Sequence, residues 1–100
     1  MAEHLHQPRA PSGIGLVLTH GAGGNARAPL LVALGEAFAG RGVTVVRYDL
    51  PYRQASPTGP PRPAGAAKDR EGLREAVAAM RGRVRGRVFL GGHSYGGRQA

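Results

Sequence analysis

The stretch that decides the fold of this chain is Gly91-Gly92-His93-Ser94-Tyr95-Gly96-Gly97, which follows a short apolar run at 88–90. An apolar strand, a G-x-S-x-G motif and then a helix are typical of a nucleophile elbow, a tight turn that exposes a reactive serine. The residues two before and two after the serine nearly touch in such a turn, so both must be small. Gly92 and Gly96 occupy these positions. We therefore predict that Ser94 is a nucleophile at a helix N-terminus, where backbone N–H groups favour negative charge.

The chain before this motif alternates between strand and helix signals. A continuous apolar run at 14–19 is typical of a parallel strand buried on both faces, and β-branched residues at 43–48 predict a second strand. Residues 87–90 are the predicted third strand, which leads into the elbow. This context favours an elbow over a chance match, which three fixed positions in a chain with 17 glycines would otherwise allow.

Two helices are predicted between these strands. Apolar residues recur every four positions from Leu30 to Phe38, after Pro29, which suits a first helical position. A second helix is predicted to begin with Asp69 as its N-cap and to end at Arg81, with one apolar stripe. Strands that alternate with helices predict a parallel sheet with right-handed crossover connections.

The length of the chain bounds its domain organisation. One hundred residues make at most one domain, which we place at 14–100. Residues 1–13 show no sustained periodicity, so we predict a flexible arm or one short edge strand. Residues 51–67 hold five of the eight prolines and are predicted to be a long loop of functional importance. The predicted fold class is α/β, with three parallel strands and two crossover helices that end at the elbow.

The composition excludes several classes of site. The absence of cysteine excludes disulfides and thiolate metal sites, and we expect no metal or cofactor. No apolar stretch reaches the roughly 20 residues of a membrane span, so a cytoplasmic protein without membrane contact is expected. The net charge of +8 comes largely from 13 arginines spread along the chain. We do not expect nucleic-acid binding, because the Arg/Gly tract at 81–86 is short and lacks aromatic residues.

The loop at 20–26, after the first predicted strand, has three interpretations. A His20-Gly21 step in this position is typical of an oxyanion-hole loop, whose backbone N–H points at the substrate oxygen. Alternatively, Gly21, Gly23 and Ala26 fit the dinucleotide fingerprint G-x-G-x-x-A, with Asp49 as the ribose-binding acid. The glycines could also serve only a sharp turn. We favour the oxyanion loop, because it explains the later elbow and the dinucleotide interpretation does not.

With both loops in view, the sequence resembles the α/β-hydrolase family from about residue 14 to residue 100. More narrowly it is similar to a small branch related to dienelactone hydrolases, which includes testis-expressed and nonspecific-lethal-complex hydrolase-like proteins. The resemblance rests on four stretches, at 18–24, 31–38, 42–53 and 89–98. Together they are far more specific than the elbow motif alone.

The resemblance implies a role for each site residue. Ser94 would be the nucleophile, and the backbone N–H groups of Tyr95 and Ala22 would form the oxyanion hole, with Gly21 or Gly23 as alternatives to Ala22. Tyr52 and the proline-rich loop would line the substrate entrance. The implied substrate is a small ester or related acyl compound, hydrolysed without a cofactor. The first predicted strand would lie in the middle of the sheet.

The sequence departs from the family pattern after the nucleophile. The family order is Ser, then Asp or Glu, then His, but none of the six residues after Ser94 is acidic or a histidine. We expect His20 and His93 to be structural, and His4 and His6 to lie in the arm. We therefore expect the N-terminal part of a hydrolase domain, with an exposed sheet edge that favours self-association. The alternatives are a non-catalytic hydrolase-like interaction module and, third, a dinucleotide-binding domain.

These expectations predict a weak enzyme. Because no acid and base follow Ser94, the 100 residues alone should hydrolyse p-nitrophenyl esters only at trace rates. The measurement is turnover by the chain and by a Ser94→Ala variant. Robust turnover that disappears with Ser94→Ala would contradict the expectation that the missing groups are needed.

Overall fold

Four strands make one sheet in the computed structural model of the chain, which describes residues 3–93 and 95–99. β2 (Gly15–Thr19) lies between β3 (Thr44–Tyr48) and β4 (Val88–Gly92) and runs parallel to both. β1 (Glu3–His6) pairs antiparallel with the other side of β3. The predicted α/β class, with three adjacent parallel strands and the first of them central, is confirmed. β1 makes the sheet a mixed one.

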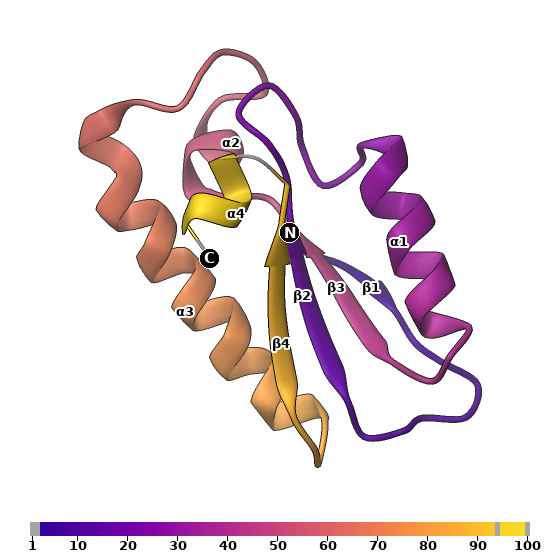
Figure 1. Ribbon diagram of the computed structural model, residues 1–100. Coiled ribbons are helices and arrows are strands. Elements are labelled where there is room, and N and C mark those ends of the chain that lie inside the picture. Colours follow the sequence, from indigo (N-terminus) through magenta and orange to yellow (C-terminus); the bar gives the residue numbers. More distant parts are fainter. Residues whose placement is uncertain (1–2, 94, 100) are drawn as a thin grey trace.

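The two long helices cover opposite faces of the sheet (Figure 1). α1 (Pro29–Ala39) connects β2 to β3 on one face, and α3 (Ala66–Arg83) leads into β4 on the other. Two short helices, α2 (Pro51–Ala55) and α4 (Tyr95–Gln99), follow the carboxyl ends of β3 and β4. A 3-10 turn, η1 (Pro63–Gly65), precedes α3. The short helices therefore lie at the carboxyl ends of the parallel strands, where the site is expected.

The predicted start of the second helix is wrong. α3 begins at Ala66, and Gly65 before it makes no side-chain cap. Asp69 is not an N-cap but a buried residue of the first helical turn. The predicted loop at 51–67 is also partly helical, because Pro51 occupies the first position of α2, where a missing N–H and a fixed φ suit a helix.

The hydrophobic core has two parts, one on each face of the sheet. Successive residues of a strand point to opposite faces, so the buried strand β2 contributes to both parts. The part beneath α3 consists of Val17, Val46, Tyr48, Leu50, Leu73, Ala76 and Met80. The part beneath α1 consists of Leu16, Leu18, Leu31 and Val45. β2 is therefore the strand around which both layers pack.

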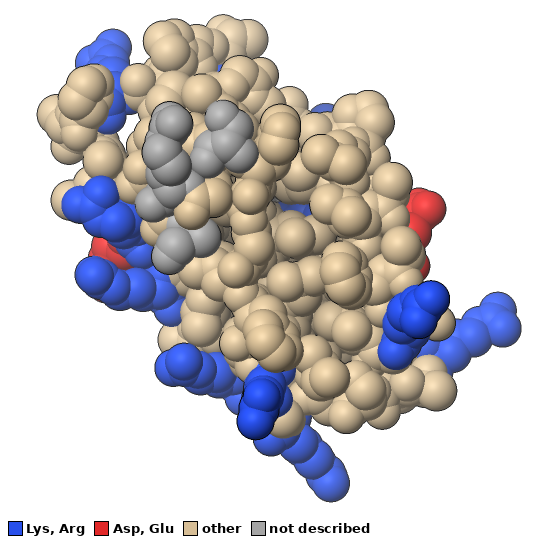
Figure 2. All heavy atoms as spheres, viewed as in Figure 1, with Lys and Arg blue, Asp and Glu red and all other residues tan. Residues whose placement is uncertain are grey.

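The basic side chains are mostly on the surface. Figure 2 shows Lys and Arg gathered over α3 and around the turn that precedes β4. Arg53 is an exception, because only 7% of it is exposed. No helix in the described part of the chain is both long and apolar enough to cross a lipid bilayer.

The core makes a direct prediction about stability. Leu73 is 2% exposed and packs in the core beneath α3, whereas Leu30 of α1 is 50% exposed. Leu73→Ala should lower the free energy of unfolding by about 2–5 kcal/mol, because it leaves a cavity. Leu30→Ala should change it by less than about 1 kcal/mol. Urea unfolding of both variants measures the difference, and equal effects would contradict this assignment of the core.

Candidate active site

The turn after β4 has the close glycine contacts of an elbow. β4 ends at Gly92 and α4 begins at Tyr95, while Ser94, the predicted nucleophile, lies outside the described residues. A Cβ atom on Gly92 would collide with the backbone of Gly96 and Gly97. A Cβ atom on Gly97 would stand 2.9 Å from the Gly92 carbonyl oxygen. The backbone at Gly92 is therefore in close contact with the backbone at Gly96 and Gly97, and side chains have no room at positions 92 and 97.

The elbow packs directly against the end of β2. The His93 N–H donates to the Thr19 carbonyl at 3.1 Å, just beyond the last paired residues of the two strands. A Cβ atom on Gly96 would collide with the His20 carbonyl oxygen and stand 2.8 Å from Thr19 Cγ2. The His93 side chain is exposed. This packing brings the predicted elbow and the start of the predicted oxyanion loop together.

His20 is a fully buried residue that joins two loops. Its Nδ1 lies 2.8 Å from the Gly21 carbonyl oxygen, and its Nε2 lies 3.0 Å from the Leu50 nitrogen. Because the Leu50 N–H can only donate, Nε2 must accept, and the ring is the neutral tautomer with its proton on Nδ1. Burial is the main reason that the pKa of His20 lies below its ordinary value. The 3.9 Å approach of Nε2 to Asp49 Oδ1 is therefore not an ion pair.

The carbonyl groups of the first loop are held by side chains from α2. The Tyr52 hydroxyl donates to the Ala22 carbonyl at 2.7 Å, and an Arg53 nitrogen donates to the same oxygen at 3.0 Å. The Gly21 carbonyl accepts from the Gly24 N–H at 3.0 Å, besides its contact with His20. A trans peptide points its C=O and the next N–H in opposite directions. The N–H groups of Ala22 and Gly23 therefore point away from these partners, and neither has an acceptor within the described part of the chain.

Arg53 connects the first loop to the proline-rich loop. Besides Ala22, its guanidinium donates to the carbonyls of Gly24 at 2.8 Å, Ser56 at 3.1 Å and Gly59 at 2.9 Å. The positive charge also lies 4.9 Å from the centre of the Tyr52 ring. Sequence reasoning assigned Arg53 no role. Its only signal was its place at the end of the stretch 42–53 that carries the family resemblance.

Asp69 is a second site residue that sequence reasoning missed. The side chain is 1% exposed, and its two oxygens accept from the Tyr52 N–H at 3.0 Å and the Tyr95 hydroxyl at 2.8 Å. The rings of Tyr52 and Tyr95 meet edge to face at 5.7 Å. Burial and the hydrogen bond to Asp69 raise the pKa of Tyr95 to about 12. Asp69 thus contacts both the helix after β3 and the helix after the elbow.

Two cavities border the proline-rich loop, and one of them also borders the first loop. One, of about 550 Å³, is lined by Ala22, Gly23, Asn25, Arg53 and the loop segment 57–60. The other, of about 710 Å³, is lined by Tyr52 and residues of the same proline-rich loop. Tyr52 therefore lines this second cavity, while its hydroxyl donates a hydrogen bond to the first loop. Within the described residues, no group of three or more His, Asp or Glu side chains is arranged to hold a metal ion.

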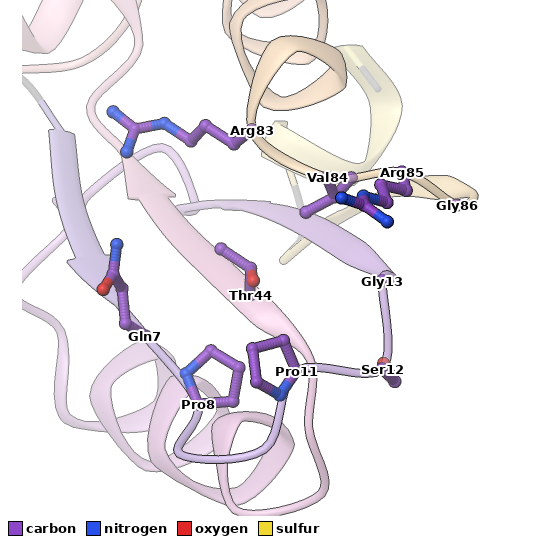
Figure 3. A pocket seen from close by; sticks show the side chains of 10 residues that line it. All are labelled: Gln7, Pro8, Pro11, Ser12, Gly13, Thr44, Arg83, Val84, Arg85 and Gly86. Carbon is purple, nitrogen blue, oxygen red and sulfur yellow. The ribbon is translucent and has the colours of Figure 1, made fainter.

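A further cavity, of about 760 Å³, lies at the opposite end of the parallel strands (Figure 3). It is bordered by Ser12 and Gly13 before β2, Thr44 at the start of β3, and Val84 before β4. Active sites of open parallel sheets lie at the carboxyl ends of the strands. We therefore place the candidate active site at the elbow and not in this cavity.

The structure disfavours the dinucleotide interpretation of the first loop. α1 begins at Pro29, three residues after Ala26, so the third position of the fingerprint does not open the helix. Asp49 Oδ1 accepts a hydrogen bond from the Ala26 N–H at 2.6 Å. The carboxylate that would bind a ribose is thus used to close the loop.

The histidines of the amino-terminal segment are remote from the elbow. His4 and His6 lie on β1, at the opposite edge of the sheet from β4. His6 Nε2 accepts from Arg47 Nε at 2.8 Å. His6 therefore has a structural partner, as does His20, which is bonded at both ring nitrogens.

Comparisons with known proteins agree with this geometry. Residues 12–100 match the family model described as an alpha/beta hydrolase domain. Among solved structures, the fold is similar to that of an alpha-beta serine hydrolase homologue from Coxiella burnetii, with a TM-score of 0.76 and 16% sequence identity. The match covers 94% of this chain and 46% of that protein's chain, so this chain spans about half of its length. A comparison with curated proteins gives no match.

The neutral state of His20 makes stability depend on pH. Its pKa in the folded chain lies below the ordinary 6.5, so the unfolded chain binds the proton more readily. The stabilisation is complete above pH 6.5 and is lost as the pH falls towards the lowered pKa, by at most about 1.4 kcal/mol per pH unit. In His20→Gln, the free energy of unfolding should decrease less between pH 7 and pH 5 than it does in the unsubstituted chain. His93→Gln, a control at an exposed residue, should show the same decrease as the unsubstituted chain. If the free energy of unfolding depends equally on pH in both variants, this role of His20 is contradicted.

Proposed function

The chain belongs to the alpha/beta hydrolase domain family, and we propose that it carries the nucleophile and the oxyanion hole of a serine hydrolase that acts on esters or related acyl compounds. The observation that carries the proposal is the packing of Gly96 on Thr19 and His20. It puts the elbow and the first loop side by side, as two contributors to one oxyanion hole require.

The proposed reaction begins when Ser94 Oγ attacks the acyl carbon of the substrate. The C=O electron pair moves onto the carbonyl oxygen, and the N–H groups of Tyr95 and Ala22 stabilise the resulting oxyanion. The hydroxyl proton passes to a histidine base and then to the leaving alcohol, and water later releases the acyl group from Ser94. The structural surroundings of His20 support the expectation that the base is another histidine.

The choice of loop amide is supported by the arrangement of the carbonyls. The Gly21 carbonyl faces His20 and Tyr52, and the Ala22 carbonyl faces Tyr52 and Arg53, so the N–H groups of Ala22 and Gly23 point away from these side chains. Ala22 remains our first choice, with Gly23 as its neighbour on the same side. Tyr52 and the proline-rich loop are proposed to line the substrate entrance, which is supported by the cavity that they border.

We also propose the narrower assignment to the branch related to dienelactone hydrolases. Support comes from the stretch 42–53, because three of its residues have interactions at the site. Asp49 closes the first loop, and Tyr52 and Arg53 hold its carbonyls. The elbow motif alone does not include these three residues, so their contacts are support from a separate part of the resemblance.

A second candidate function is a non-catalytic interaction module. In the described part of the chain, β4 has no strand on its outer side, and Phe89 is 51% exposed. An unpaired edge with an apolar side chain is a surface on which a second chain can pair. In that case the chain should associate with itself or a partner without any reactivity at Ser94.

The test is covalent labelling of Ser94 with a fluorophosphonate, located by mass spectrometry. We expect slow but selective labelling, because an oxyanion hole retains part of the rate enhancement without the other triad members. The label should be absent from Ser94→Ala. No labelling, together with self-association in sedimentation, would favour the interaction module. A thermal shift with NADH would favour the dinucleotide alternative.

A further inference from the structure

Asp69 is a carboxylate buried without a basic partner in the described part of the chain. Burying a charge is costly unless hydrogen bonds or an opposite charge compensate for it. Here both oxygens accept hydrogen bonds, one from the Tyr52 N–H and one from the Tyr95 hydroxyl. Its place in the first turn of α3 lets the helix dipole offset more of the cost. An apolar side chain of similar size could be buried here without needing hydrogen bonds or an opposite charge. The presence of a carboxylate at this position therefore needs an explanation.

The first oxygen leads to the loop after β2. Tyr52, whose N–H it binds, donates its own hydroxyl to the Ala22 carbonyl at 2.7 Å. The Tyr52 ring also contacts the His20 ring edge to face at 5.7 Å. Fixing the backbone at Tyr52 therefore fixes the hydroxyl that orients the loop peptide.

The second oxygen leads to the elbow. Tyr95 directly follows Ser94 in the chain, and its hydroxyl donates to Asp69 at 2.8 Å. The Tyr95 ring packs edge to face on Tyr52, at an interplanar angle of 89°. The residue after the serine thus has its side chain tied to the same carboxylate that fixes Tyr52.

We propose that Asp69 is a positioning residue, whose carboxylate keeps the loop amide near Ala22 and the backbone of Tyr95 at the spacing that one substrate oxyanion requires. This inference rests on the proposed function of Ser94. Asp69 contacts both donors only through the two tyrosines, and it touches no reacting atom. Small displacements of such donors reduce rates strongly, by about 10- to 100-fold for roughly 1 Å.

Asp69→Asn tests this role with almost no change in volume. With the amide oxygen on the Tyr52 N–H, the Tyr95 hydroxyl loses its charged acceptor and meets an NH2 donor in its place. The matched control is Glu71→Gln on the same helix, which removes the same charge from an exposed residue paired with Arg74. Tyr95→Phe removes the hydroxyl alone and keeps the ring packing.

The readout is the rate of fluorophosphonate labelling at Ser94 in the full chain, separated into reagent binding and the covalent step. Asp69→Asn should slow the covalent step about 10-fold or more and leave reagent binding nearly unchanged, while Glu71→Gln labels like the unsubstituted chain. In the Tyr95→Phe background, Asp69→Asn should have a smaller effect, because the shared link is already broken. Amide hydrogen exchange at 20–25 should be faster in Asp69→Asn than in the control.

The failures can be told apart. If the unsubstituted chain is not labelled at Ser94, the proposed function itself is overturned. If Asp69→Asn is labelled as fast as Glu71→Gln, only the role of Asp69 is overturned. Should Asp69→Asn fail to fold, Tyr95→Phe decides the matter, since labelling at the unsubstituted rate would contradict the link between Tyr95 and Asp69.

Discussion

The site depends on the parallel pairing of β2 with both of its neighbours. In this register Thr19 lies opposite Tyr48 of β3 and opposite Gly92 of β4. When parallel strands end at the same level, the segments that follow them all begin at the same end of the sheet. His20, Asp49 and the elbow are the next residues after those three ends, and this is why segments distant in sequence meet. A slip of one residue in either pairing would turn the strand faces over and separate the elbow from the loop.

The sequence was a good guide wherever the signal is local. The buried strands follow from apolar runs, and α1 follows from apolar residues that recur every four positions after Pro29. The glycines of the elbow follow from the steric demand of the turn. The start of α2 could have been found by the same reasoning, because Pro51 occupies a first helical position as Pro29 does. Asp69 misled us, because an acidic residue near a helix start resembles an N-cap until its long-range partners are known. Hydrogen bonds to residues 17 and 26 positions away leave no local pattern.

In the first loop, a buried cation orients the backbone from one side. Arg53 binds the carbonyl of Ala22 from one side, and the carbonyl of Gly24 as well. Each carbonyl that is bound there turns the following N–H to the other side of the loop. His20 contributes in the same sense, since its neutral ring donates to the Gly21 carbonyl. At Gly21 and Ala22 the side chains bind the carbonyls and not the amides, so the N–H groups of Ala22 and Gly23 face away from those side chains.

The elbow is supported unequally on its two sides. β2 is buried along its whole length, whereas β4 is only partly buried and forms the outer edge of the described sheet. Packing on Thr19 and His20 fixes the inner side of the turn. Support from the direction of α3 comes through the side chain of Tyr95, whose hydroxyl meets Asp69. Few buried contacts make an element open more easily, so an edge strand that carries a precise turn needs such a specific bond. The hydrogen bond from Tyr95 to the buried carboxylate of Asp69 thus supports the turn on the side where the strand is exposed.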